Sequence, residues 1–414
     1  MRLLNLSEEK NQIFPKSLLA VLIVGMLQAC SSSGGDSDAD NSDASTDEPS
    51  GTMTDAAATD VPSSLPDASS AVMFEFSMDS VTGGTTTAQA QLFEPLGETP
   101  DGGYPLVVWA HGTTGIANSC APSLSFTIFG NDVVVNSLLA AGYAVLAPDY
   151  EGFGTPSVHP YYQRDSHANS VLAAIPAAHE ISELTDEWAM VGHSQGGHVV
   201  LAAARAEQDP TFPLQAVVAL APGTDLEPLS DRAFEAIDLA IANQNFDEAG
   251  NRIFFLNVNG GFVANGFQAA DPSFDPATLF GDDVANLVAI APEENTCGIF
   301  AVEVGDALNE HFDAGGALED FAGLRRDWFT EPALVGPLAQ NALNDEAQDT
   351  PLLVVQGDMD TQIPDAATTD FVNLQMSLGT DVDYELISGA DHIDVAEGDF
   401  GIALDWLVEQ FPPQ

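Results

Sequence analysis

A strand, a sharp turn and a helix follow one another at residues 188–206, and this junction constrains the fold more than any other segment. An apolar run at 188–191 is followed by Gly192-His193-Ser194-Gln195-Gly196-Gly197 and then by an Ala-rich stretch. In the Gly-x-Ser-x-Gly pattern, small residues permit a strained turn that lifts the serine hydroxyl above a sheet. The five-residue pattern alone is weak, but the strand before it and the helix after it are what this geometry requires. The junction therefore predicts Ser194 as a nucleophile.

The rest of the folded part alternates between strand and helix patterns. We expect short antiparallel strands at 73–78 and 86–93, then strands at 104–110, 143–147, 188–191, 214–220, 351–355 and 382–387, with helices at 132–141, 166–183, 195–206, 366–378 and 400–410. Such alternation predicts an α/β fold with a mostly parallel sheet flanked by helices. Residues 224–344 show no pattern of this kind and are expected to be an irregular insertion.

A serine hydroxyl needs a base, and the base needs an orienting acid. In this fold the chain order is Ser, acid, His, and His392 lies in a loop between a predicted strand and the final helix. His198 would sit inside the helix after the turn, and His311 belongs to the insertion. His392 is therefore the predicted base.

Two carboxylates, Asp358 and Asp360, follow the apolar strand at 351–355. Active-site groups gather at this end of a parallel sheet, so either could orient the base. Asp360 is preferred because Gly357-x-x-Asp360-x-x-Ile363-Pro364 is similar to the acid loop of many serine hydrolases. Asp358 remains the alternative.

An acyl-transfer intermediate also needs two N–H donors for its oxyanion. The backbone of Gln195, directly after the nucleophile, is one candidate. Thr113 in His111-Gly112-Thr113-Thr114-Gly115 is the other, by similarity to His-Gly-x loops of hydrolases. The alternative for this second segment is a tight turn without a catalytic role.

Several segments together resemble the secretory lipase family, in its bacterial branch related to fungal lipase A. They are the loop at 111–115 with Cys120-Ala-Pro-Ser, then 148–156 with His159-Pro-Tyr, then 192–198. The resemblance implies the α/β-hydrolase fold and activity on esters. It also implies a lid over the acyl site within the insertion at 224–344, whose contacts cannot be transferred.

Cys120 and Cys297 are the only cysteines after Cys30. An even pair in an exported chain predicts a disulfide, with two buried free thiols as the alternative. The nearby His111, His193 and His198 are interpreted as turn and packing residues, because no cluster of metal-ligand spacing is visible. We expect neither a metal nor a cofactor.

The N-terminus has the pattern of an export signal. Basic Arg2, Lys10 and Lys16 precede an apolar run at 18–27, which is short for a membrane span and ends in Leu27-Gln28-Ala29-Cys30. This end resembles a bacterial lipobox, so residues 1–29 are predicted to be a lipoprotein signal peptide and Cys30 the lipidated residue. The protein would then be exported and anchored by lipid to the cell envelope, with the outer membrane as the expected site. The alternative is an ordinary signal peptide and a secreted protein.

Composition changes sharply after the signal. Residues 30–70 are rich in Ser, Asp, Thr and Ala and predict a disordered acidic tether, which leaves 71–414 as the folded domain. Over the whole chain 63 acidic residues face nine basic ones, for a formal charge of −54, and no Lys follows Lys16. Nucleic acid is excluded as a partner, because phosphate binding needs clustered Lys and Arg. Such a surface without Lys is typical of a saline habitat, where salt screens the repulsion.

These features predict an exported serine hydrolase that cleaves carboxylic esters, a lipase or esterase, through an acyl intermediate on Ser194. A peptidase or polyester depolymerase with the same triad is the first alternative. A non-catalytic surface binding module is the second, which the intact set of Ser194, Asp360 and His392 disfavours.

Overall fold

A computed structural model describes residues 49–124, 131–155, 157–206, 208–293, 297–343, 346–398 and 400–413. The signal segment 1–29, Cys30 and the first part of the predicted tether lie outside these residues. Within the described residues, no helix is both long enough and apolar enough to cross a membrane.

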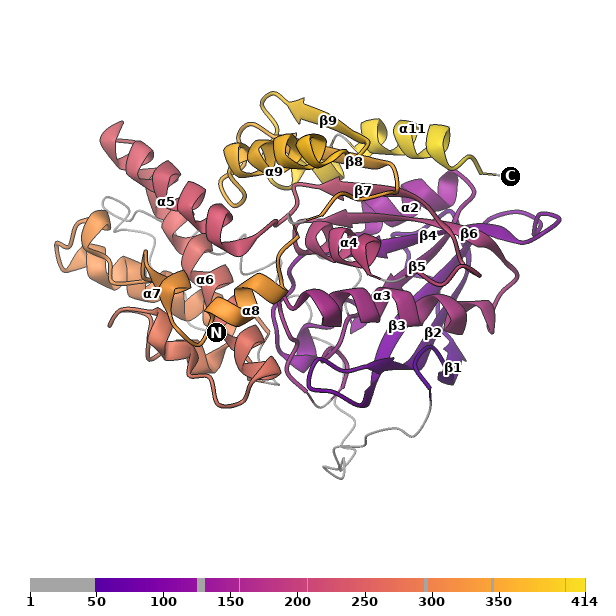
Figure 1. Ribbon diagram of the computed structural model, residues 1–414, viewed down its shortest axis with the longest axis horizontal. Helices are drawn as coiled ribbons and strands as arrows, with labels where there is room; N and C mark the ends of the chain where they lie inside the picture. The colour runs from indigo at the N-terminus through magenta and orange to yellow at the C-terminus, as the bar shows by residue number, and fades with distance from the viewer. Residues whose placement is uncertain are drawn as a thin grey trace, which may run out of the picture.

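A nine-stranded sheet forms the centre of the molecule (Figure 1). The strands are β1 (Met53–Ala58), β2 (Ala68–Asp79), β3 (Thr85–Pro95), β4 (Tyr104–Ala110), β5 (Ala144–Pro148), β6 (Leu184–His193), β7 (Leu214–Leu220), β8 (Leu352–Gly357) and β9 (Val382–Ile387). Their order is β1-β2-β3-β5-β4-β6-β7-β8-β9. The pairs from β1 to β5 are antiparallel, and those from β5 through β4 to β9 are parallel. The predicted α/β fold with a mostly parallel sheet is confirmed.

Helices cover both faces of this sheet. They are α2 (Asn131–Ala140), α3 (Arg164–His179), α4 (Gln195–Arg205), α9 (Asp365–Leu378), α10 (Asp394–Glu397) and α11 (Phe400–Gln410). In β4, Leu106 and Val108 face the core beneath α3 and α4, whereas Val107 and Trp109 face the core beneath α2 and α11. All four are fully or almost fully buried, as expected for a central parallel strand with two covered faces.

The insertion between β7 and β8 is helical, so the expectation of an irregular stretch at 224–344 was wrong. It contains α5 (Leu226–Ala242), α6 (Phe246–Ala270), α7 (Ile299–Asp313) and α8 (Val335–Gln340), with 3₁₀ turns at Pro276–Leu279, Val288–Ile290, Leu318–Asp320 and Trp328–Thr330. Two further 3₁₀ turns, Asn118–Cys120 and Pro122–Leu124, follow β4. We call Leu226–Gln340 the helical insertion; it lies beside the sheet with a core of its own (Figure 1).

The predicted tether also ends earlier than expected. Residues 53–58 form β1, which pairs with β2 along the edge of the sheet, and Leu65 is fully buried against the core. Strand pairing through the backbone needs little apolar side-chain area, which explains why β1, exposed at five of six positions, carried no hydrophobic signal. The folded domain therefore includes residues from 49 onward.

Candidate active site

Ser194 stands at the turn between β6 and α4. Its backbone has φ 58° and ψ −114°, a strained conformation for a residue with a side chain. The turn is tight because the chain passes close to itself: a Cβ on Gly192 would lie 2.0 Å from the Gly196 oxygen, and one on Gly196 would lie 1.9 Å from the Ala110 oxygen. Only glycine fits at these two positions, so the local sequence forces the serine side chain outward at the end of the sheet.

Three side chains from separate segments meet at this turn. His392 Nε2 lies 2.8 Å from Ser194 Oγ, and His392 Nδ1 lies 2.7 Å from Asp360 Oδ2. Asp360 follows β8, and His392 lies in the loop after β9. A neutral imidazole whose Nδ1–H donates to the carboxylate leaves Nε2 free to accept the hydroxyl proton. The structure thus brings together the three residues singled out in the sequence.

Three further hydrogen-bond donors besides His392 hold Asp360 in place. The backbone N–H groups of Gln362 and Ile363 donate to Oδ1 at 2.7 and 2.8 Å, and the Gln356 side-chain amide donates to Oδ2 at 3.0 Å. Burial alone would raise the pKa of this carboxyl, but the charge of His392 and these hydrogen bonds outweigh burial, so the pKa lies below its ordinary value. Asp360 therefore stays ionised while almost fully buried.

Asp358, the alternative acid, occupies a different position. Its side chain is exposed, and its oxygens accept hydrogen bonds from Ser388 Oγ at 2.9 Å and the Gly389 N–H at 2.7 Å. These bonds connect the end of β8 to the loop that leads to His392. Asp358 thus holds this loop from the outside, whereas Asp360 is the acid that bonds the histidine ring.

The loop after β4 passes directly beside Ser194. A Cβ on Gly112 would lie 3.7 Å from the Ser194 Cβ and 3.3 Å from His193 Nδ1. Thr113 comes next, and its hydroxyl is 2.6 Å from the Tyr161 hydroxyl. Gln195 opens α4, where the first N–H groups have no partner inside the helix and the helix dipole favours negative charge. The two segments predicted in the sequence therefore meet at Ser194: Gly112 lies against it and precedes Thr113, and Gln195 follows it in the chain.

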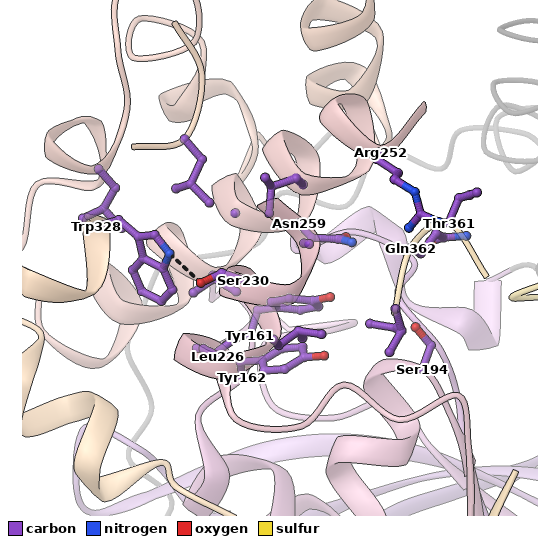
Figure 2. Close-up of a pocket in the computed structure, with 18 residues that line it drawn as sticks. Tyr161, Tyr162, Ser194, Leu226, Ser230, Arg252, Asn259, Trp328, Thr361 and Gln362 are labelled. Carbon is purple, nitrogen blue, oxygen red and sulfur yellow. Dashed lines mark hydrogen bonds between the residues drawn. The ribbon is translucent and has the colours of Figure 1, made fainter. Parts of the chain in front are cut away.

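A pocket opens from Ser194 toward the helical insertion (Figure 2). It contains about 810 Å³ of space not filled by protein atoms, part of it open to solvent. Its apolar lining comes from Leu226, Leu229, Leu256, Val263, Leu279, Leu324, Trp328 and Ile363. Ser194 is at one end in Figure 2 and Trp328, whose indole N–H donates to Ser230 Oγ at 3.1 Å, is on the opposite side.

The sequence model of the alpha/beta hydrolase family matches residues 107–399, most of the chain. The chain belongs to this family. No curated protein matches it in sequence. Membership of the α/β-hydrolase superfamily, which the sequence predicted by resemblance, is thereby confirmed.

Solved structures of similar fold support the same conclusion. The rice cell wall degrading esterase LipA from Xanthomonas oryzae has a TM-score of 0.67 at 19% identity, with 88% of this chain and 100% of that chain covered. Candida antarctica lipase A has a TM-score of 0.66 at 14% identity, with 88% and 82% covered. A hydrolase described as putative from Legionella pneumophila has 0.63 at 16% identity, with 86% and 97% covered. At these identities the likeness is one of fold.

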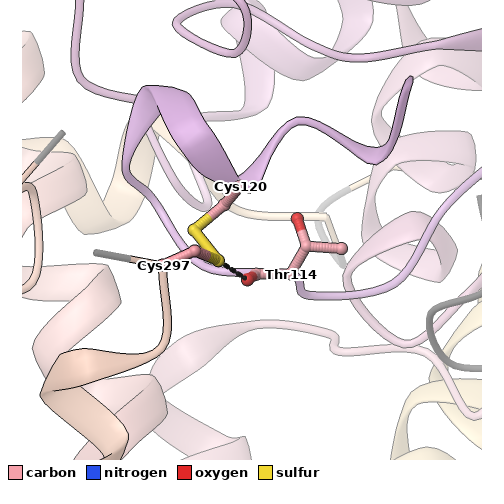
Figure 3. The surroundings of a disulfide bond; sticks show 3 residues. All are labelled: Thr114, Cys120 and Cys297. Atoms are coloured by element: carbon pink, nitrogen blue, oxygen red, sulfur yellow. Dashed lines mark hydrogen bonds between the residues drawn. A yellow bond between two sulfur atoms is a disulfide. The ribbon is translucent and has the colours of Figure 1, made fainter. Parts of the chain in front are cut away.

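A disulfide joins the two parts of this alpha/beta hydrolase (Figure 3). It links Cys120, after the loop at 111–115, to Cys297 at the start of α7, with the two Cα atoms 5.2 Å apart. Cys297 Sγ lies 3.1 Å from the Thr114 carbonyl oxygen, next to the proposed oxyanion residue. The insertion is thus covalently tied to the segment that passes beside Ser194. The predicted pairing is present in the structure.

Buried neutral histidines surround the turn of this hydrolase. His193 Nε2–H donates to the His392 carbonyl at 2.7 Å, and His111 Nδ1–H donates to the Gly112 carbonyl at 2.7 Å. His159 Nδ1–H donates to the Glu151 carbonyl at 2.8 Å, so its Nε2 can accept from the Gln195 side-chain amide at 2.6 Å. Burial lowers the pKa of His193 and His159 to about 3 and that of His111 to about 4. In the described residues, no group of His, Cys, Asp or Glu is arranged to hold a metal ion.

Sequence reasoning missed several residues that the fold brings to the site. Gln356 bonds Asp360, and its position in the apolar strand β8, as the one polar residue there, was a usable signal. Tyr161 stands in the His159-Pro-Tyr segment quoted above but was given no role there, whereas the pocket residues Arg252 and Trp328 had no signal in the sequence. The latter two come from the helical insertion, where no helix was expected.

Proposed function

We propose that this protein hydrolyses carboxylic esters through an acyl intermediate on Ser194. The observation that carries the proposal is the continuous chain of hydrogen bonds from Ser194 Oγ through His392 to Asp360, at the end of an apolar pocket. Apolar walls of this size suit an acyl chain, and the serine hydroxyl at one end suits attack on the ester carbonyl.

In this mechanism His392 Nε2 takes the Ser194 proton as Oγ attacks the ester carbon. Asp360, ionised and buried, stabilises the imidazolium that forms and holds the ring. The N–H groups of Gln195 and Thr113 bind the oxyanion of the tetrahedral intermediate. His392 then gives its proton to the leaving alcohol, and in the second half it activates water, which releases the acid and restores Ser194.

The test uses the purified protein and a series of p-nitrophenyl esters of increasing acyl length. We expect hydrolysis by the wild type and a loss of nearly all turnover in Ser194→Ala, whose melting temperature should be unchanged because the side chain only loses a hydroxyl. A phosphonate ester should label Ser194 and no other residue. Labelling elsewhere, or turnover in Ser194→Ala at the wild-type rate, would refute the mechanism.

Export of the chain belongs to the same proposal. It is supported by the disulfide, since such bonds persist in oxidising compartments, and by the signal pattern of residues 1–29. Lipid anchoring at Cys30 stays a prediction from the sequence.

A further inference from the structure

Positive charge is scarce in this protein, and one cation lies in the pocket. From residue 71 onward the chain has six Arg and no Lys. Arg232 and Arg326 are typical of the others on the surface: they are 38% and 58% exposed and form ion pairs with Asp370 and Asp238. Arg252, on α6, has a side chain only 13% exposed and lines the pocket that contains Ser194. Its location needs an explanation other than surface charge pairing.

The guanidinium of Arg252 is only partly satisfied. Its Nε–H donates to Glu248 Oε1 at 2.9 Å, one turn earlier on the same helix. Its Nη1 is buried and has no hydrogen-bond partner among the described residues. A buried charged donor without a partner is costly, and a guanidinium offers five N–H donors in a fixed fork that suits a carboxylate. The unpaired N–H groups of Arg252 Nη1 can therefore donate hydrogen bonds to an anionic group that enters the pocket.

Arg252 and Ser194 line the same pocket. Figure 2 shows the Arg252 side chain extending from α6 toward Thr361 and Gln362, on the side of the pocket where Ser194 lies. The remaining walls are mainly apolar, so a carboxylate in this pocket would have Arg252 as its cation. Because Ser194 itself lines the pocket and the acyl group stays bonded to its Oγ in the intermediate, the acyl group is the part of the substrate that occupies it.

We propose that Arg252 binds a carboxylate at the far end of the acyl group, so that the enzyme prefers monoesters of dicarboxylic acids over neutral esters of the same length. This inference rests on the proposed ester hydrolysis at Ser194. The net charge of −54 repels anions at a distance, so this preference must come from short-range contact inside the pocket. Salt screens the surface field, whereas a buried contact is screened much less.

The experiment compares p-nitrophenyl hydrogen adipate with its methyl ester, which has the same chain but no charge. Rates are measured in about 1 M NaCl, where the Debye length is about 3 Å, and corrected for spontaneous hydrolysis. We expect a higher kcat/KM for the acid than for the methyl ester in the wild type. Arg252→Gln should lower the ratio of kcat/KM for the acid to kcat/KM for the methyl ester by about 10- to 100-fold, the range for one charged hydrogen bond.

Two variants separate recognition from a structural role. Glu248→Gln removes the negative partner of Arg252, so it should raise the preference for the acid, whereas a purely structural ion pair predicts the same effect from both variants. Arg232→Gln removes an arginine of α5 that does not line this pocket, and it should leave the preference unchanged.

Equal losses on both esters in Arg252→Gln, or no wild-type preference for the acid, overturn the inference while ester hydrolysis stands. Hydrolysis of neither ester by the wild type overturns the proposed function, and this inference with it.

Discussion

Mild acid is expected to unfold this protein, because its fold holds several histidines in the neutral form. Burial lowers the pKa of His159, His193 and His198 to about 3 and that of His111 to about 4. In an unfolded chain the pKa of histidine is about 6.5. Between these values the unfolded chain binds more protons than the native protein. The stability these residues contribute is therefore complete above about pH 6.5 and is lost as the pH falls toward 3.

The magnitude follows from the two pKa values. At about pH 5, a histidine with a folded pKa of about 3 lowers the free energy of unfolding by about 2 kcal/mol, and the four together by about 8 kcal/mol. That loss is comparable to the whole free energy of unfolding of a typical domain, which is about 5–15 kcal/mol.

Two buried acids, Asp149 and Glu151, work in the opposite direction, because burial raises the pKa of both. Burial raises the pKa of Asp149 to about 6, so its protonation on acidification favours the native state. Between about pH 7 and 5, protonation of Asp149 raises the free energy of unfolding by only about 1 kcal/mol, which is small compared with the loss caused by the histidines. Surface carboxylates stay mostly ionised down to about pH 5, since their ordinary pKa is near 4. The window from about pH 6.5 to 5 therefore reports mainly on the histidines.

Urea unfolding at constant salt, from about pH 7.5 to 5, measures the effect. Burial also lowers the pKa of His167 well below its ordinary value, so five buried histidines take up about five protons on unfolding. We therefore expect the free energy of unfolding to fall steeply below about pH 6.5. His198→Phe keeps a ring against Tyr162, 4.4 Å away between centroids in the native protein, and removes one titrating group. Its slope should be shallower by the equivalent of about one proton. A free energy that stays flat from about pH 6.5 to 5, or an unchanged slope in His198→Phe, would refute the reasoning.

Two further predictions concern the site and the disulfide. Asp360→Asn should lower kcat by a factor on the order of 10⁴, by analogy with serine proteases. Asp358→Asn should lower kcat only by about a few-fold, because Asp358 is exposed and bonds the loop at Ser388. Steady-state kinetics on one ester compare the two variants, and a larger loss of kcat in Asp358→Asn would reverse the assignment of the acid. Reduction of the bond between Cys120 and Cys297, which are 177 residues apart, should lower the free energy of unfolding by about 3–5 kcal/mol in urea melts, and the double Cys→Ser variant should no longer respond to reductant.

The elements that the sequence predicts best are those whose cause is local. Strands β4 and β7 were predicted at their observed bounds, because a strand buried on both faces is apolar along most of its length. The helix α6 was missed because it contains glycines and asparagines, which have low helix propensity. Its glycines allow neighbouring side chains to pack closely against the helix: a Cβ on Gly261 would lie 2.3 Å from the Phe300 ring. Only the packing of the insertion reveals why this helix forms.

The candidate site likewise has a part that the sequence predicts and a part that it does not. Ser194, Asp360 and His392 each follow a strand of the parallel sheet, so their convergence at one edge could be inferred from the order of elements. The pocket could not be inferred, because its walls come from the helical insertion and depend on how α5 and α6 pack against the loop at 361–363. Arg252 is the clearest example: in sequence it is one arginine on an unrecognised helix, and only the fold places it in the wall of the pocket that contains Ser194.

The choice of neutral histidine around the nucleophile has an electrostatic reason. The loops at the edge of the sheet leave backbone carbonyls without strand partners, and His111 and His193 each donate one N–H to such a carbonyl. Lys or Arg could donate as well, but each would carry a positive charge next to His392, whose ring centroid is 4.8 Å from that of His193. A second cation there would oppose the imidazolium that His392 forms in the proposed acyl transfer and would compete for the carboxylate of Asp360. A neutral imidazole satisfies the carbonyl without this cost, and the consequence is the sensitivity to acid described above.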